Sequence, residues 1–203
     1  MIPPPLRDEK SVFLNIPFDK SYTRLFIALI AGLTALGRKP RCVLEVPSAS
    51  NRLSRVFGLI TSCGASIHDL SRVSLYGRLR MPRFNMPFEL GIAYALSEQG
   101  EHQFFVLEQK PYRLQASLSD LNGHDPHIHH KTQEGVLGCL LDCFGTMWTT
   151  PSPEQLTELT RELSQIILKL QRRQKRDHPF YPHLFRQAAD AAMELTRRQG
   201  LIA

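Results

Sequence analysis

A single carboxylate, Glu89, stands in an otherwise apolar stretch of the sequence, RFNMPFELGIAYAL. Asn85 is of a type that often caps helices, and Pro87 is tolerated in a first helical turn, so the stretch predicts a helix that begins at Asn85. Glu89 would then lie near the positive end of the helix dipole, which favours its ionised form. An ionised carboxylate can attack an electrophilic carbon, or stabilise an oxocarbenium-like centre and orient a sugar hydroxyl. The alternative is that Glu89 only complements the helix dipole.

The segments expected around Glu89 alternate between strand and helix. Apolar runs predict strands at residues 11–17, 41–46, 66–70 and 103–108, and helices at residues 22–36, 53–60 and 85–100. Such alternation indicates βαβ units and a parallel sheet with helices on both faces. Ligands of these sheets bind beyond the carboxyl ends of the strands. The residues at those ends are 15–19, 47–48, 69–71 and 108–110.

A boundary is expected at TTPSPEQ, residues 149–155. Ser152 suits an N-cap, Pro153 a first helical position and Gln155 the third residue of a capping box. A long amphipathic helix follows, and after HPFYPH a last helix runs from about residue 184 to 198. We therefore expect an α/β domain at residues 1–148 and a C-terminal helical extension at residues 149–203, packed on the sheet domain or on a second copy of the chain.

The composition narrows the classes of function. The chain of 203 residues is 42% hydrophobic and 22% charged, and its N-terminal MIPPPLRDEK lacks the apolar segment of a signal peptide. No window is long and apolar enough for a membrane span. Four cysteines without CxxC spacing indicate buried free thiols, and we expect a cytoplasmic protein.

The charge of the chain favours anionic partners. The formal net charge is +6, but no zinc-finger, basic-zipper or RNA-recognition signature accompanies it, so nucleic acid is not favoured as a partner. The sequence also has no GxGxxG and no GxxxxGK[ST], which leaves a dinucleotide fingerprint and a P-loop unsupported.

Two segments, SIHDLSRV and RFNMPFELGIAYAL, together resemble the signature of the nucleoside 2-deoxyribosyltransferase-like and TIR-like superfamily of N-glycosidic-bond enzymes. In that superfamily a strand ends in an Asp, often followed by Ser, and after a loop a helix carries a Glu in an E-L/I-G-x-A pattern. The matching positions are Asp69, Ser71 and Glu89 to Ala93. VFLNIPFD is similar to the first strand of such chains, and SDLNGHDPHIHH resembles bacterial TIR-like proteins of unassigned role. The resemblance covers roughly residues 11–145.

The resemblance implies a fold and a set of roles. The fold would be α/β and flavodoxin-like, a doubly wound parallel sheet of about five strands with the C-terminal helical appendage. Glu89 would be the catalytic glutamate, and Asp69 would position or protonate the departing base. Gly91 would let the helix approach the sheet closely. His68 points opposite to Asp69 in an alternating strand, so a structural role is expected for it.

The loop between Asp69 and Glu89 departs from the family pattern because it is long and rich in arginine. Arginines stand at positions 72, 78, 80 and 83, and guanidinium groups bind phosphate bidentately. A nucleotide or NAD is therefore expected before a free nucleoside; the alternative is a solvated loop or a protein-contact surface. The predicted substrate-binding residues are Asn15, Pro17, Phe18, Ser71, Arg83 and Asn85.

The expected function is cleavage or transfer of an N-glycosidic bond in a nucleotide or NAD, with bacterial antiphage defence as one setting. No cofactor beyond the substrate is expected, and the partner would be a second copy or another protein. The alternative is a TIR-like module that senses nucleotides or contacts proteins without turnover. The histidines of GHDPHIHH match no established zinc spacing, so we expect a polar loop over the site and no metal.

Overall fold

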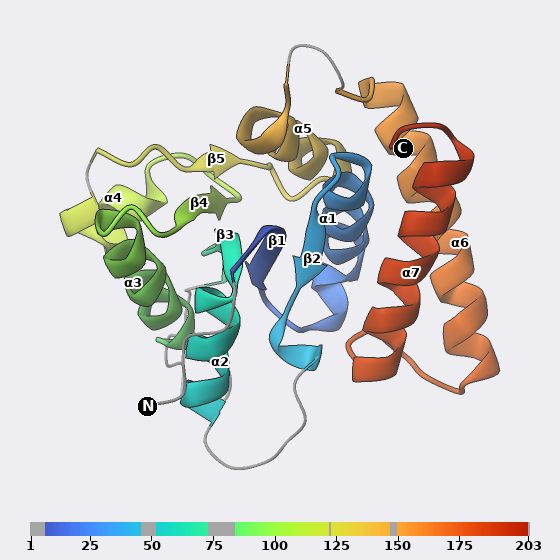
Figure 1. Ribbon diagram of the computed structural model, residues 1–203, viewed down its shortest axis with the longest axis horizontal. Helices are drawn as coiled ribbons and strands as arrows, with labels where there is room; N and C mark the ends of the chain where they lie inside the picture. Colours follow the sequence, from blue (N-terminus) through green and yellow to red (C-terminus); the bar gives the residue numbers. More distant parts are fainter. Residues whose placement is uncertain (1–6, 46–51, 73–83, 122, 147–149, 203) are drawn as a thin grey trace. The chain divides into compact units, whose positions relative to one another are not determined.

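The computed structural model describes residues 7–45, 52–72, 84–121, 123–146 and 150–202 (Figure 1). The chain forms two compact units that are interleaved along the sequence. The sheet unit comprises Met1–Pro17, Arg41–Val43 and Ser48–His130, and the helical unit comprises Phe18–Pro40, Leu44–Pro47 and Lys131–Ala203, of which the described residues are considered below. The expected boundary between residues 148 and 149 stays a prediction.

The strands form one five-stranded parallel sheet in the order β2-β1-β3-β4-β5. Their bounds are β1 Asp8–Asn15, β2 Lys39–Arg41, β3 Cys63–Asp69, β4 Gln103–Glu108 and β5 His127–Ile128. This strand order is that of flavodoxin-like α/β folds. The predicted fold class is therefore confirmed.

Two predictions about strands were wrong or incomplete. The strand expected at residues 41–46 is shorter and earlier, because β2 ends at Arg41 and a 3-10 turn, η2 (Val43–Glu45), follows. Pro40 is compatible with β2 because a proline is tolerated on an edge strand. β5 was not predicted, since a strand of two residues carries no alternation that could reveal it.

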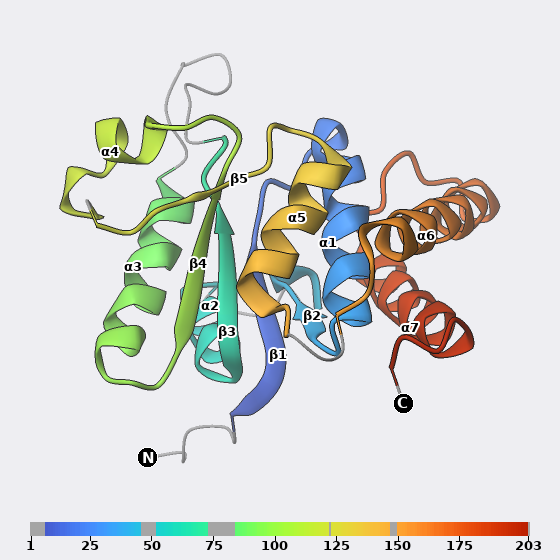
Figure 2. The same ribbon diagram turned by 90° about the horizontal axis from the view of Figure 1, so that it is seen from above.

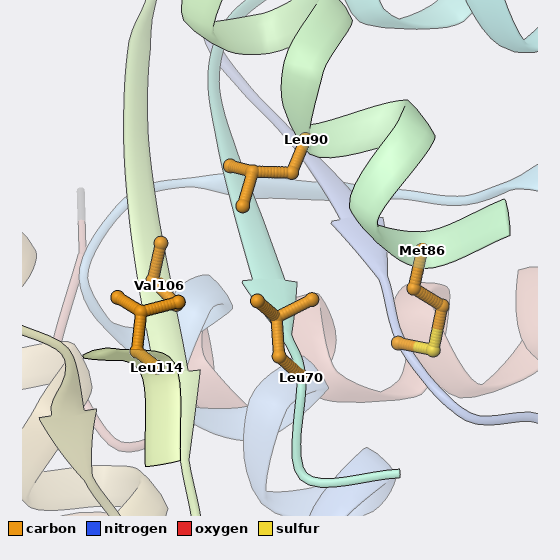
Figure 3. Packing of buried hydrophobic residues seen from close by; sticks show 5 residues of the cluster. All are labelled: Leu70, Met86, Leu90, Val106 and Leu114. Atoms are coloured by element: carbon orange, nitrogen blue, oxygen red, sulfur yellow. The ribbon is translucent and has the colours of Figure 1, made fainter. Parts of the chain in front are cut away.

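In the sheet unit, α2 (Arg52–Thr61) and α3 (Asn85–Glu98) pack on β3, and α3 also contacts β1 and β4. Met86 and Leu90 stand one turn apart on α3, so they reach the same cluster of buried side chains. That cluster also contains Leu70, Val106 and Leu114. Figure 3 shows Leu90 projecting from α3 toward the strands. Two short helices, α4 (Arg113–Ser117) and η3 (Ser119–Leu121), follow β4.

The helical unit contains η1 (Lys20–Tyr22), α1 (Thr23–Ala35), α5 (Gln133–Phe144), α6 (Pro153–Arg173) and α7 (Pro182–Arg198). α1 contacts α5, α6 and α7 (Figure 2). Every residue of α1 from Leu25 to Ala35 is buried, as expected for a helix that is apolar all round. α5 was not predicted as a separate helix.

The start of α6 confirms the predicted capping box. The Gln155 backbone N–H donates to Ser152 Oγ at 3.3 Å, and the Ser152 N–H donates to Gln155 Oε1 at 2.8 Å. The cysteine prediction also holds, since Cys42, Cys63 and Cys139 are buried free thiols and Cys143 is half-buried. Among the described helices, none combines the length and apolar character of a membrane span.

Candidate active site

Asp69 is the last residue of β3, and its side chain is fully buried. The Ser71 backbone N–H donates to Asp69 Oδ1 at 2.9 Å, and Asp69 Oδ2 lies 3.2 Å from His129 Nε2. His129 follows β5 directly, and its N–H donates to the Glu108 carbonyl at 2.9 Å, which continues the ladder of the sheet. The register aligns Asp69 with Leu107 and Leu107 with His127. His129 therefore shares a sheet face with Asp69.

Ser71 completes this group, because its Oγ lies 2.8 Å from His129 Nε2. The three residue types are those of a Ser-His-Asp triad, but both oxygens meet the same ring nitrogen. A triad needs the serine and the carboxylate on different nitrogens, so that one proton can pass while the other orients the ring. The group is therefore a buried acid–base pair with a hydroxyl ligand, and the geometry does not support a serine nucleophile.

Glu108 and Arg113 form an ion pair at the end of the neighbouring strand, β4. Glu108 is the last residue of β4 and is buried, and burial raises the pKa of its carboxyl while Arg113 opposes that rise. Arg113 Nη1 lies 3.3 Å from Glu108 Oε2 and donates to the Ser71 carbonyl at 3.0 Å. This guanidinium thus ties the segment after β3 to the end of β4. Sequence reasoning marked Glu108 as a strand-end residue but missed Arg113 and His129.

A chain of buried hydrogen bonds begins at Asn15, the last residue of β1. Asn15 Nδ2 donates to the Met86 carbonyl in α3 at 2.9 Å, and it lies 2.9 Å from His68 Nδ1. His68 Nε2 and His102 Nε2 each lie 2.8 Å from Ser66 Oγ. His102 Nδ1 lies 3.1 Å from a strand carbonyl, that of Cys63. We call Asn15, His68, Ser66 and His102 the buried polar chain.

The proton positions in the buried polar chain follow from its chemistry. An amide nitrogen only donates, so His68 Nδ1 accepts and its Nε2–H donates to Ser66. The Ser66 hydroxyl then donates to His102 Nε2, and His102 Nδ1–H donates to the carbonyl. Burial and the neighbouring His102 lower the pKa of His68 to about 3, so both the bonding and the titration describe a neutral ring. His68 has the structural role that its strand position indicated.

Glu89 lies on α3 with only 7% of its surface exposed. Burial raises the pKa of its carboxyl to about 7, against the opposing charge of Arg52 at the start of α2. Desolvation therefore acts against the ionised form that the helix dipole was expected to favour. The expected Asn85 cap was wrong: the N-cap is Phe84, and it makes no side-chain cap bond. Among the described residues, no side chain or backbone group hydrogen-bonds to the Glu89 carboxyl.

The structure assigns Asp69 and Glu89 to different surroundings. Asn15 and His68 are register partners, and the contacts of Asn15 show that α3 covers their face of the sheet. Asp69 follows His68 in the strand and points to the other face. No contact between the two carboxyls is found among the described residues, so their joint action stays a prediction. Gly91 is exposed and a Cβ there would meet nothing within 4 Å, so the close-approach role expected for it was wrong.

The remaining predicted substrate-binding residues are distributed between the two units. Pro17 is buried just beyond β1, and Asn85 is exposed at the start of α3. Phe18 belongs to the helical unit, where its ring centroid lies 5.7 Å from that of Phe180. Arg83, like Arg78 and Arg80, lies outside the described residues.

The histidines of the loop at residues 123–130 make different contacts. The His124 ring lies 5.2 Å from that of Phe104, and His127 lies 6.1 Å from Phe105. His129 is the partner of Asp69. In the described part of the chain, no three metal-ligating side chains converge. These contacts give the loop a packing role, with His129 as its contribution to the strand ends.

Comparisons with protein-family models, with curated proteins and with solved structures found no match to this chain. The resemblance to the N-glycosidic-bond enzymes therefore rests on the residues quoted for it and stays a prediction.

Proposed function

We propose that the protein cleaves or transfers an N-glycosidic bond of a nucleotide or NAD. The observation that carries this proposal is Glu89, a buried carboxyl whose pKa is raised to about 7. It lies one turn after Met86, whose carbonyl is held by Asn15 at the carboxyl end of β1. Catalytic carboxyls typically have a shifted pKa, and in parallel sheets they lie beside the ligand-binding edge.

The chemistry follows from the poor solvation of Glu89. As the C1′–N bond breaks, its electron pair leaves with the base and positive charge develops on the ribose. The attraction between a carboxylate and this developing positive charge is stronger when little water surrounds the carboxylate. Glu89 then either bonds to C1′, for later transfer to water or a second base, or stabilises the cation while water attacks. Arg52, whose charge already acts on Glu89, suits a phosphate of the substrate.

The departing base has different needs in the two substrate classes. Nicotinamide leaves NAD as a neutral ring and needs no proton. A purine or pyrimidine takes the electron pair of the bond and needs a proton, for which the Asp69–His129 pair is the candidate donor. Cleavage of NAD would fit the expected setting in antiphage defence.

The test is release of the base from NAD and from nucleoside monophosphates, followed by chromatography. We expect Glu89→Gln to lose at least about 100-fold in rate, because it removes the charge that the reaction needs. Glu98→Gln, an exposed position on the same helix, is the matched control and should keep full activity. Since the ionised form acts, the rate should rise with pH and level off above about 7.

Two results would overturn the proposal. One is the absence of base release by the wild-type chain, and the other is equal release by Glu89→Gln. Saturable nucleotide binding without release would instead assign the chain to the class of non-catalytic nucleotide-sensing modules. Assembly with a second copy or a partner protein belongs to the same proposal and is checked by light scattering during the assay.

A further inference from the structure

A cavity of about 450 Å³ opens among α1, α5 and α6 of the helical unit. Its apolar wall includes Ile27, Leu137 and Leu168, one from each helix. Its volume is within the range of small-molecule sites. None of the carboxyl-edge residues described above lines it, so it is independent of the proposed N-glycosidic chemistry.

Gln171 and Thr160 are buried polar residues of this cavity. Gln171 is 8% exposed, and no hydrogen bond of its side-chain amide is found within the described chain, although its amide atoms are not among the buried side-chain atoms that lack a partner. Two of the lining hydroxyls differ, because Thr160 Oγ1 donates to the Leu156 carbonyl and Ser164 Oγ to the Thr160 carbonyl, each at 2.8 Å. A ligand that fills the cavity would cover this amide and remove its access to water, so a hydrogen bond from the ligand to Gln171 would compensate for that loss.

Arg24 contributes a positive charge to the same lining. Its Nε and Nη2 donate to Gln133 Oε1 at 3.4 and 3.3 Å, which is a neutral acceptor. Among the described residues, no carboxylate lies within ion-pair distance of Arg24. The other arginine of the lining, Arg161, is ion-paired with Glu158, so Arg24 is the lining guanidinium left for an anionic ligand.

We infer that this cavity binds an apolar small molecule that carries one carboxylate and one further hydrogen-bonding group. The carboxylate meets the Arg24 guanidinium, which forms charge-assisted hydrogen bonds with such groups. The further group bonds to the Gln171 amide, and the apolar body packs against the leucine and isoleucine wall. Hydroxylated aromatic or medium-chain carboxylic acids have this chemistry.

The test uses the full chain and four probes in calorimetric titrations: 4-hydroxyphenylacetate, 4-hydroxyphenylacetamide, phenylacetate and 8-hydroxyoctanoate. At least one hydroxylated acid should bind, and 4-hydroxyphenylacetate should bind about tenfold more tightly than its neutral amide, as one charge-assisted bond predicts. Arg24→Gln should remove that difference. Arg172→Gln makes the same charge change at an exposed α6 position outside the lining and should retain it.

Gln171→Leu keeps the volume of the side chain and removes the amide. It should erase the preference for 4-hydroxyphenylacetate over phenylacetate, whereas Gln165→Leu, exposed on α6, should not. Ser164→Phe should fill the cavity and abolish binding, with circular dichroism confirming that the helices remain. The inference is overturned if no probe binds, if acid and amide bind equally, or if Ser164→Phe leaves binding intact.

Discussion

In the sheet unit, buried polar side chains bond to one another across strands and helices, whereas in the helical unit buried hydroxyls bond to the helix that carries them. Ser66 joins His68 of β3 and His102, the residue just before β4. Thr34, Thr160 and Thr196 each donate to the carbonyl four residues earlier in their own helix. The first kind of bond requires the tertiary fold, and the second forms wherever the helix forms.

The two units therefore differ in how many ionisable side chains their interiors contain. In the sheet unit burial shifts the pKa of His68, Glu89 and Glu108, so the interior of that unit responds to pH. In the helical unit the interior is built mainly from leucine, isoleucine, phenylalanine and alanine. We expect mutations in the two interiors to differ in size and in pH dependence.

The largest loss of stability is expected from Phe26→Ala in the helical unit. Phe26 is fully buried, and its ring lies 5.0 Å from that of Phe180 and 5.9 Å from that of Phe185. Truncation should lower the free energy of unfolding by about 3–5 kcal/mol. Urea unfolding should show a similar loss at mildly acidic and mildly basic pH, because these rings carry no charge. Leu168→Ala, half-exposed on α6, is the control and should cost much less.

A smaller loss is expected when the buried polar chain is cut at Ser66. Ser66→Ala leaves one ring nitrogen of His68 and one of His102 without a partner, and should cost about 2–4 kcal/mol in unfolding free energy. Thr160→Val in the helical unit also removes a buried hydroxyl, but should cost less than about 1 kcal/mol. Equal losses in the two variants would contradict the contrast between the units.

Glu89→Gln should stabilise the protein by about 3 kcal/mol above neutral pH. Burial raises the pKa of Glu89 from 4.5 to about 7, so the folded chain keeps a proton that the unfolded chain releases in this window. Stability contributed by this group is therefore lost as pH rises through the window. The variant removes that loss, while its base release should fall. Thermal unfolding across the pH range checks this, with Glu98→Gln as the control.

His68 changes the stability of the protein with pH in the opposite direction to Glu89. The same unfolding experiment therefore tests both residues. Its pKa is lowered from 6.5 to about 3, so only the unfolded chain takes up a proton between these values and stability falls with falling pH. The slopes from His68 and Glu89 offset one another between about pH 4.5 and 6.5. In Glu89→Gln the stability should therefore rise with pH more steeply than in the wild type; an unchanged slope would contradict the assignment.

The smallest effects are expected at glycines. A Cβ at Gly64 in β3 would lie 2.7 Å from the Cα of Glu9, so Gly64→Ala must move backbone and should cost about 1–3 kcal/mol. In the helical unit a Cβ at Gly32 would meet a leucine side-chain end, Leu140 Cδ1, which can rotate away at lower cost. Gly58→Ala faces open space in α2 and should stabilise by up to about 1 kcal/mol. Chemical denaturation ranks the three.

The features that were predictable from sequence are those set by local patterns. The capping box at Ser152 and the run of β4 depend on neighbours in the chain, and both were found. Asp69 was marked because strand ends follow from the βαβ order. Its partner His129 was not, because the two-residue β5 that carries it has no sequence pattern. The pKa of Glu89 also escaped prediction, since burial is a property of the packed fold.

The interleaving of the two units has a consequence for synthesis on the ribosome. α1, an apolar helix, leaves the ribosome early, but its partners α5, α6 and α7 begin only at residue 133. Until then the nascent chain holds a helix whose contacts with α5, α6 and α7 do not yet exist, while β3 and β4 of the other unit are already available. Exposed apolar surface of this kind promotes aggregation. The order of translation therefore favours assembly of the sheet unit before the helical unit. α1 can pack against α5, α6 and α7 only after the C-terminal part of the chain has been synthesised.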